Sequence, residues 1–158
     1  MAYVTFEDFN GMYPGEISVE EFKNLEWDAR RVVDAHTTGV DNVRKLRVAF
    51  PEDADDAEAV LRCMCTLINL MHKIGAVEKH RGLELREDGM VRGGVVSSVS
   101  SGSESISYAT GGTAIDAAVS SISERNKLYS QIVKHALSGV CDANGVHLLY
   151  MGVYPYVC

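Results

Sequence analysis

The segment from residue 55 to residue 80 constrains the fold more than any other part of this 158-residue chain. Its apolar residues recur at helical spacing and form a wide stripe along one side. Asp55 and Asp56 place negative charge at its start, which favours the helix dipole. The pattern therefore predicts the longest helix of a helical core. The stripe consists of Ala57, Val60, Leu61, Met64, Leu67, Ile68, Met71 and Ile74.

Two further segments have the same periodicity. Residues 18–36 begin at Ser18, which together with Glu21 has the pattern of a capping box. Residues 113–137 form a second amphipathic pattern, which Ser138-Gly139 ends. Each of the two segments is expected to form one uninterrupted helix.

A short helix opened by Thr5 is expected before Asn10-Gly11. With 46% apolar and 23% charged residues, the composition is that of an ordinary globular protein. The sequence therefore predicts a mainly α fold in a single domain covering residues 1–158. Three main helices and a short N-terminal helix form a small bundle, which carries an extended β-ribbon loop between the second and third main helices and an extended C-terminal arm.

The ribbon is expected in residues 83–109. Asp88-Gly89 and Ser101-Gly102 are hairpin-turn signals between short segments of strand-forming residues. Seven of the eleven residues 97–107 are serine, so a ribbon here has too few apolar contacts to stabilise itself. Two interpretations stay open: a mobile loop, or a ribbon that pairs with something outside its own subunit.

The arm is expected in residues 146–158, which are apolar and rich in tyrosine. Chain ends are usually polar and frayed, so an end of this composition should be covered by its own helices or by a partner. We expect residues 148–150 to anchor to the subunit and residues 152–158 to reach a partner.

The net charge of −7 excludes general binding to phosphate backbones, which needs a basic surface. The basic run Arg44-Lys45-Leu46-Arg47 is expected to be a solvated loop. No uninterrupted apolar run approaches the roughly 18 residues of a membrane span, and the first residues lack the features of a signal peptide.

No catalytic, cofactor-binding or metal-binding pattern is found in the sequence. The spacing of Cys63 and Cys65 turns their side chains to different sides of a helix, and the histidines form no ligand pair. The glycine-rich Gly111-Gly112-Thr113 lacks the lysine of a phosphate-binding loop. We therefore expect no enzyme, no cofactor and no metal, with reduced thiols at the cysteines.

Three groups of residues follow one another as signatures along the chain. They are Thr5–Phe9, Tyr13–Gly15, Ile17–Phe22 and Ala29–Gly39 in the first group, Gly94–Tyr108 in the second, and Leu148–Tyr154 in the third. Their order and content resemble the small head–tail connector proteins of long-tailed bacteriophages and prophages. Met151 stands where that family frequently has an arginine.

The resemblance implies a structural virion protein that acts in head completion and has no catalytic activity. Connector subunits of this kind form a homo-oligomeric ring, expected to be a dodecamer, under the portal vertex, where they extend the DNA channel and receive the tail. The implied partners are further copies of the chain, the portal protein and a tail-side connector or stopper protein. DNA passes through without specific binding, and no membrane is involved. The expected location is the virion, and the host cytoplasm during assembly.

Partner contacts are expected in the ribbon and the arm, and two other classes of function stay open. One is a small cytosolic enzyme with an unrecognised site, and the other is a regulatory protein-binding module that forms a stable monomer or dimer and no ring. The candidate partner-binding residues are Val95, Val99, Ile106, Tyr108, Tyr154, Pro155 and Tyr156.

Overall fold

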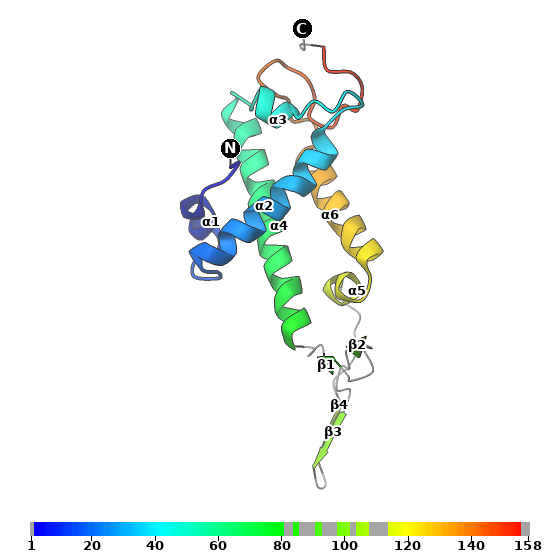
Figure 1. The fold of residues 1–158 in the computed structure, drawn as a ribbon. Helices are drawn as coiled ribbons and strands as arrows, with labels where there is room; N and C mark the ends of the chain where they lie inside the picture. The colour runs from blue at the N-terminus through cyan, green and yellow to red at the C-terminus, as the bar shows by residue number, and fades with distance from the viewer. Residues whose placement is uncertain are drawn as a thin grey trace.

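The computed structural model is mainly helical, as the sequence predicts (Figure 1). It describes residues 2–80, 84–85, 91–92, 98–101, 104–107 and 114–155. Three helices, α2, α4 and α6, form the body of the molecule. The helices in this part of the chain are α1 (Phe6–Met12), α2 (Val19–Thr37), α3 (Lys45–Val48), α4 (Ala54–His80), α5 (Ala114–Ser120) and α6 (Ile122–Ala136).

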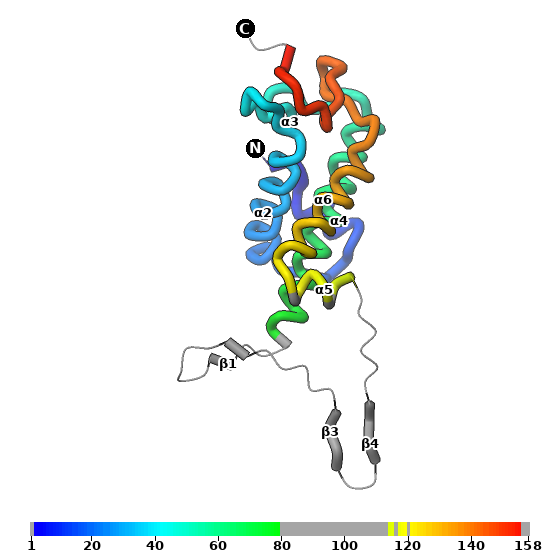
Figure 2. The backbone as a smooth tube through the Cα atoms, turned by 90° about the vertical axis from the view of Figure 1, so that its right-hand side faces the viewer, coloured from blue at the N-terminus to red at the C-terminus, as the bar shows by residue number. Residues whose placement is uncertain are grey.

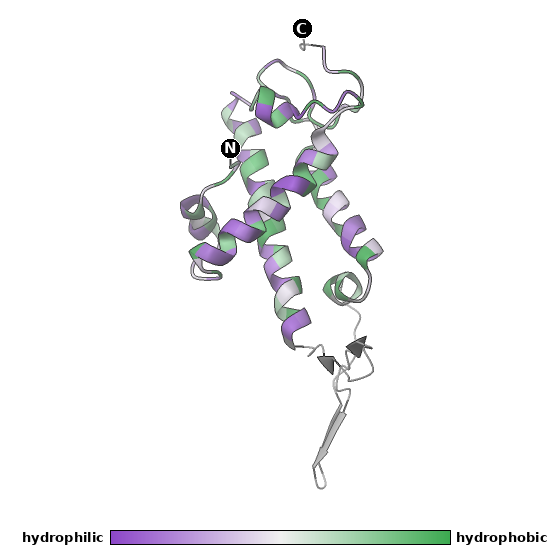
Figure 3. Ribbon diagram, viewed as in Figure 1, coloured by the Kyte–Doolittle hydropathy of each residue, from purple (hydrophilic) through white to green (hydrophobic). Residues whose placement is uncertain are grey.

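Helix α4 is the longest helix of the described residues, as predicted, and it lies at the centre of the bundle. It packs against α1, α2, α5 and α6. Met64, Leu67 and Ile68 of α4 are completely buried in one core with Val33 of α2 and Val133 of α6. Figure 3 shows the hydrophobic residues of α4 following its length between stretches of hydrophilic surface.

Helix α4 is also the one helix in the described part of the chain that is long and apolar enough to cross a membrane. Ala54–Lys79 meets the requirements for a membrane span by length and composition alone. Of its most apolar 18 residues, 44% are buried inside the protein. The central helix of a bundle has the same properties, and the packing of α4 accounts for its apolar face.

The caps of α1 and α2 differ from the expected pattern. A complete capping box forms at α1, where the hydroxyl of Thr5 accepts from the backbone of Asp8 and the Asp8 carboxylate accepts from the backbone of Thr5. At α2 only half of the predicted box forms, since Ser18 accepts from the backbone of Glu21 at 3.2 Å. The Glu21 carboxylate lies instead 3.0 Å from Nδ1 of His72, so it ties α2 to α4.

The prediction of one helix over residues 113–137 is wrong, because the helix is interrupted at Ser121, between α5 and α6. Its backbone is extended (φ −145°, ψ 125°) and its hydroxyl accepts from the backbone of Glu124, which makes it the N-cap of α6. Serine competes for backbone hydrogen bonds and so favours a cap over a helix interior. The corner turns α5 across the end of the bundle (Figure 1), where Arg125 donates to the carbonyl of Ala118 at 3.0 Å.

Four short strands lie between α4 and α5 in sequence. Strand β1 (Glu84–Leu85) pairs antiparallel with β2 (Val91–Arg92), and β3 (Ser98–Ser101) pairs antiparallel with β4 (Glu104–Ser107). In the second pair, the Cα atoms of Val99 and Ile106 are directly opposite. The residues joining these strands lie outside the described part, so the ribbon over 83–109 as a whole stays a prediction.

Candidate functional site

The connection between α2 and α4 and the segment after α6 come together at one end of the helical body (Figures 1 and 2). The backbone N–H of Val40 donates to the carbonyl of Met151 at 3.1 Å, which joins the two segments directly. This end of the molecule therefore holds most of the predicted C-terminal arm in place. The contacts made there determine which side chains of the arm are exposed to solvent.

Lys45 is the first anchor of the C-terminal segment. Instead of lying in a solvated basic loop, it is completely buried at the start of α3. Its Nζ donates to the carbonyl oxygens of Leu148 at 2.9 Å and His147 at 3.3 Å, and to that of Tyr150. An ammonium group carries three donors and no acceptor, so these three carbonyls satisfy it. The expectation for this basic run is therefore wrong at Lys45.

Tyr154 is the second anchor. Its backbone N–H donates to Oδ2 of Asp41 at 2.6 Å, and its hydroxyl donates to Oδ2 of Asp142 at 2.5 Å and accepts from Nδ2 of Asn144 at 2.9 Å. The bond from the Tyr154 backbone is the main cause of the lowered pKa of Asp41. Burial lowers the pKa of Lys45, and the charges of Asp142 and Asp41 oppose that effect.

Two glycines let the segments approach. A Cβ atom added at Gly39 would overlap the carbonyl oxygen of Gly152, and one added at Gly152 would overlap the ring of Tyr150. Backbone atoms cannot move out of the way as a flexible side chain can, so position 39 needs glycine for steric reasons.

Between these anchors, apolar side chains face solvent. Their exposed fractions range from 50% to 73%. Contiguous exposed apolar side chains on a globular protein are typical of interaction sites. We call this group the C-terminal surface, and it consists of Val40, Tyr150, Met151 and Val153.

The structure changes the expected roles of the arm residues. Tyr154 is 1% exposed, so the prediction that it reaches outward is wrong, whereas Pro155 is exposed. Tyr150, expected as an anchor, is half exposed. Leu148 is completely buried in the core, so that part of the predicted anchor is confirmed. Tyr154 is an additional anchor because Asp41 and Asp142 accept hydrogen bonds from it.

The structure describes the other candidate partner-binding residues only in part or not at all. Val99 and Ile106 have described backbones but no described side chains. Val95, Tyr108 and Tyr156 lie outside the described residues. The structure therefore brings Tyr154 and Pro155 to the end of the bundle and leaves the ribbon residues as predictions.

A buried polar cluster links the N-terminal segment to α2 and α3. The hydroxyl of Tyr3 donates to Oδ1 of Asp34 at 2.6 Å, and Arg47 pairs with Oδ2 of the same carboxylate at 3.1 Å. Burial, followed by the hydrogen bond to Asp34, raises the pKa of Tyr3. Each oxygen of Asp34 has a partner, so the cluster stabilises the fold rather than offering a reactive group.

A groove of about 570 Å³ lies between α2, α4 and α6. Glu78, one of its two carboxylates, is bonded to Arg125, and burial raises the pKa of Tyr129. Most of the wall is apolar, which is typical of a seam between helices. The apolar lining includes Leu25, Val32, Ala35, Met71 and Ile74.

Among the described residues, no group of His, Cys, Asp and Glu could hold a metal ion. Burial raises the pKa of Cys63 to about 12 and that of Cys65 to about 11, so both thiols are inert. Sequence reasoning missed one pair: Sγ of Cys141 lies 3.4 Å from Nδ1 of His147. The Asn144-Gly145 turn between them was the signal, since it brings the flanking residues together in an antiparallel bridge.

No family model, curated protein or solved structure matches this chain.

Proposed function

We propose that this protein is a ring-forming head–tail connector of a long-tailed bacteriophage or prophage. It is a structural virion protein that docks under the portal, extends the DNA channel and provides the surface to which the tail attaches. The order of the three sequence signatures supports this assignment, and the helical architecture is compatible with it.

The C-terminal surface is the observation that carries the proposal. Its apolar side chains stand on a segment that Lys45 and Tyr154 hold from beneath. A segment already ordered in the free subunit loses little conformational entropy when it binds, so the surface is prepared for a partner. We assign the portal or a neighbouring subunit as that partner, contacted through Val40, Met151 and Val153 rather than through Tyr154.

The ribbon is the second proposed contact. In this proposal, the ribbon expected over residues 83–109 pairs with a neighbouring subunit through Val95, Val99, Ile106 and Tyr108. The antiparallel pairing of Val99 with Ile106 supports a hairpin in this region. The low apolar content of residues 97–107 supports a partner outside the subunit, because the ribbon buries little area on its own. Pro155 and Tyr156 extend the same function at the end of the arm.

A small enzyme and a regulatory binding module are the alternatives. The Cys141–His147 pair is the feature that most favours an enzyme, since a thiol beside an imidazole is a nucleophile arrangement. The native mass separates the connector from the module, because a connector forms a ring on the capsid whereas a module stays a monomer or dimer.

The test uses capsids that carry the portal but lack tails, prepared from the phage or prophage that encodes the chain. Wild-type protein is expected to sediment with these capsids and to make them competent for tail attachment. Met151→Asp with Val153→Asp should abolish binding, because it places charge in an apolar contact. The control is Ile122→Asp, which changes an exposed apolar residue at the start of α6.

Two results would contradict the proposal. In the first, wild-type protein fails to bind portal-bearing capsids. In the second, the Met151→Asp/Val153→Asp protein folds normally and completes capsids as the wild type does, which would remove the C-terminal surface from the function.

A further inference from the structure

A second surface gathers arginines around an exposed tryptophan. It is a hollow of about 790 Å³ formed by α2, α3 and the chain between them. Trp27 is 49% exposed, and the guanidinium of Arg31 lies 4.9 Å from the centroid of its ring. Arg44 and Arg47 line the other side of the hollow. We call Trp27, Arg31, Arg44 and Arg47 the Trp–Arg surface.

This surface is positive on a protein whose net charge is −7. Arg47 is neutralised by the buried Asp34. Arg31 and Arg44 form no ion pair with any carboxylate in the part of the chain that the structure describes. Tryptophan and arginine are the residues most enriched at the energetic centres of protein interfaces, so the composition suits an acidic protein partner.

The chain itself carries a matching acidic segment in residues 52–58, which contains five carboxylates. Asp53 uses one oxygen to cap α4, accepting from the backbone of Asp55 at 3.0 Å, and Glu58 pairs with Arg62 at 2.5 Å. The carboxylates of Glu52 and Asp55 are exposed and have no ion pair within the described residues.

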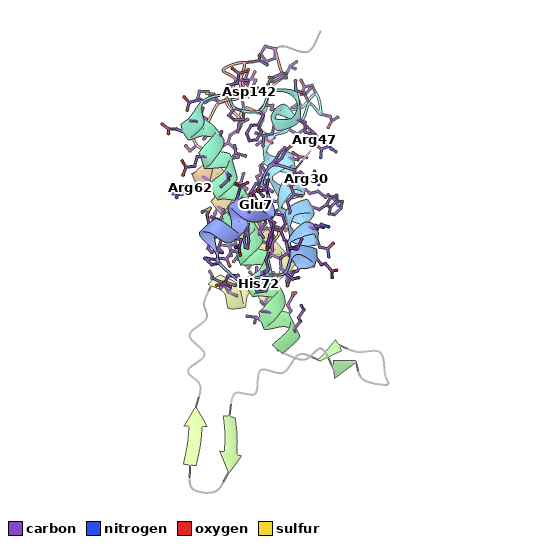
Figure 4. All side chains as sticks on the ribbon, turned by 90° about the vertical axis from the view of Figure 1, so that its left-hand side faces the viewer. Glu7, Arg30, Arg47, Arg62, His72 and Asp142 are labelled. Carbon is purple, nitrogen blue, oxygen red and sulfur yellow. The ribbon has the colours of Figure 1, made fainter. Side chains whose placement is uncertain are left out.

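The two patches lie on different sides of the subunit. Figure 4 places Arg30 and Arg47 on one side of the molecule and Arg62, one turn beyond Glu58, on the other. No ion pair joins the two patches within the described residues of one subunit. Contact between two different patches on neighbouring copies is heterologous, and such contacts build rings when the rotation closes.

We propose that the Trp–Arg surface of one subunit binds the acidic segment 52–58 of a second copy of this chain. The inference rests on the proposed function, because it names the subunit contact that a connector ring requires. A nucleic acid is the poorer occupant, since the field of a chain with net charge −7 repels a polyanion as it approaches.

Charge reversal tests the contact. Arg31→Glu with Arg44→Glu makes both patches acidic, and Glu52→Lys with Asp55→Lys makes both basic. Each variant alone should lose self-association on the order of 100-fold in apparent Kd, since like charges then face each other. An equimolar mixture should recover it, because every contact again joins opposite charges. The readout is sedimentation velocity at low salt, and association should weaken as salt is added.

The matched control is Lys127→Glu with Lys134→Glu, which makes the same change of net charge on α6 and should leave association intact. The inference is overturned if wild-type protein does not self-associate at its highest soluble concentration. It is also overturned if the mixture fails to recover association, or if the Trp–Arg surface binds duplex DNA more tightly than micromolar. These outcomes are separable from failure of the proposed function, because capsid docking through the C-terminal surface is measured independently.

Discussion

Replacing Lys45 with methionine should destabilise the protein, although methionine has a similar length and is apolar. The substitution removes the ammonium that three carbonyls share. The carbonyl of His147 keeps another partner, because the backbone of Tyr150 donates to it at 3.0 Å. Those of Leu148 and Tyr150 have no second partner in the described part of the chain.

The magnitude follows from these two carbonyls. A buried acceptor that loses its only partner costs about 1–3 kcal/mol. The bond to Leu148 is buried and the bond to Tyr150 is only partly buried, so the two losses together cost about 1–4 kcal/mol. Removing the buried ammonium offsets part of this because desolvating a charge is unfavourable. We expect the free energy of unfolding to fall by about 1–3 kcal/mol.

The assay is urea unfolding followed by circular dichroism, with Lys127→Met as the control. Lys127 is an exposed lysine paired with Glu124, so its loss should change the free energy of unfolding by no more than about 0.5 kcal/mol. In limited proteolysis of the Lys45→Met protein, the first cleavage should fall in the segment after α6, because this segment has lost its anchor. Equal stability of the two variants would refute the role given to Lys45.

Three further predictions concern the same end of the molecule and the core. Tyr154→Phe should lower the free energy of unfolding by about 1–3 kcal/mol, because it removes one buried and one partly buried hydrogen bond. The control is Tyr150→Phe, at a half-exposed position, which should be nearly neutral; equal losses would contradict this. Gly39→Ala should lower the melting temperature by several degrees and increase amide exchange at the Val40 N–H that bonds to Met151, because the new Cβ meets a carbonyl oxygen; unchanged exchange would show that the segments separate freely. Burial raises the pKa of the Cys63 thiol from 9.0 to about 12, so the folded chain holds a proton that the unfolded chain loses. This group should therefore lower the free energy of unfolding by about 1.4 kcal/mol per pH unit above pH 9. The free energy of unfolding of Cys63→Ala should fall less steeply with pH than that of the wild type, and equal slopes would disprove the prediction.

Helical periodicity was sufficient for α2 and α4, because their buried positions depend on spacing within one segment. It failed at Ser121, because the apolar positions keep helical spacing on both sides of the serine pair. The helix ends there because Ser121 caps the start of α6. It also could not distinguish Tyr150 from Tyr154, since both are aromatic residues in an extended segment. Tyr154 is held by Asp41, which binds its backbone from more than a hundred residues away, and by Asp142, which binds its hydroxyl.

The candidate site shows the same division. The sequence indicated that the apolar C-terminal segment should be covered or should bind a partner, and it contained no recognised catalytic motif. The tertiary structure decided that Lys45 is an anchor and not a solvated charge, and that Val40 joins Met151 in one exposed surface. The physical reason is range: periodicity, caps and turns report interactions within a few residues, whereas the partners of Lys45 lie 102 to 105 residues away and exist only once the chain has folded.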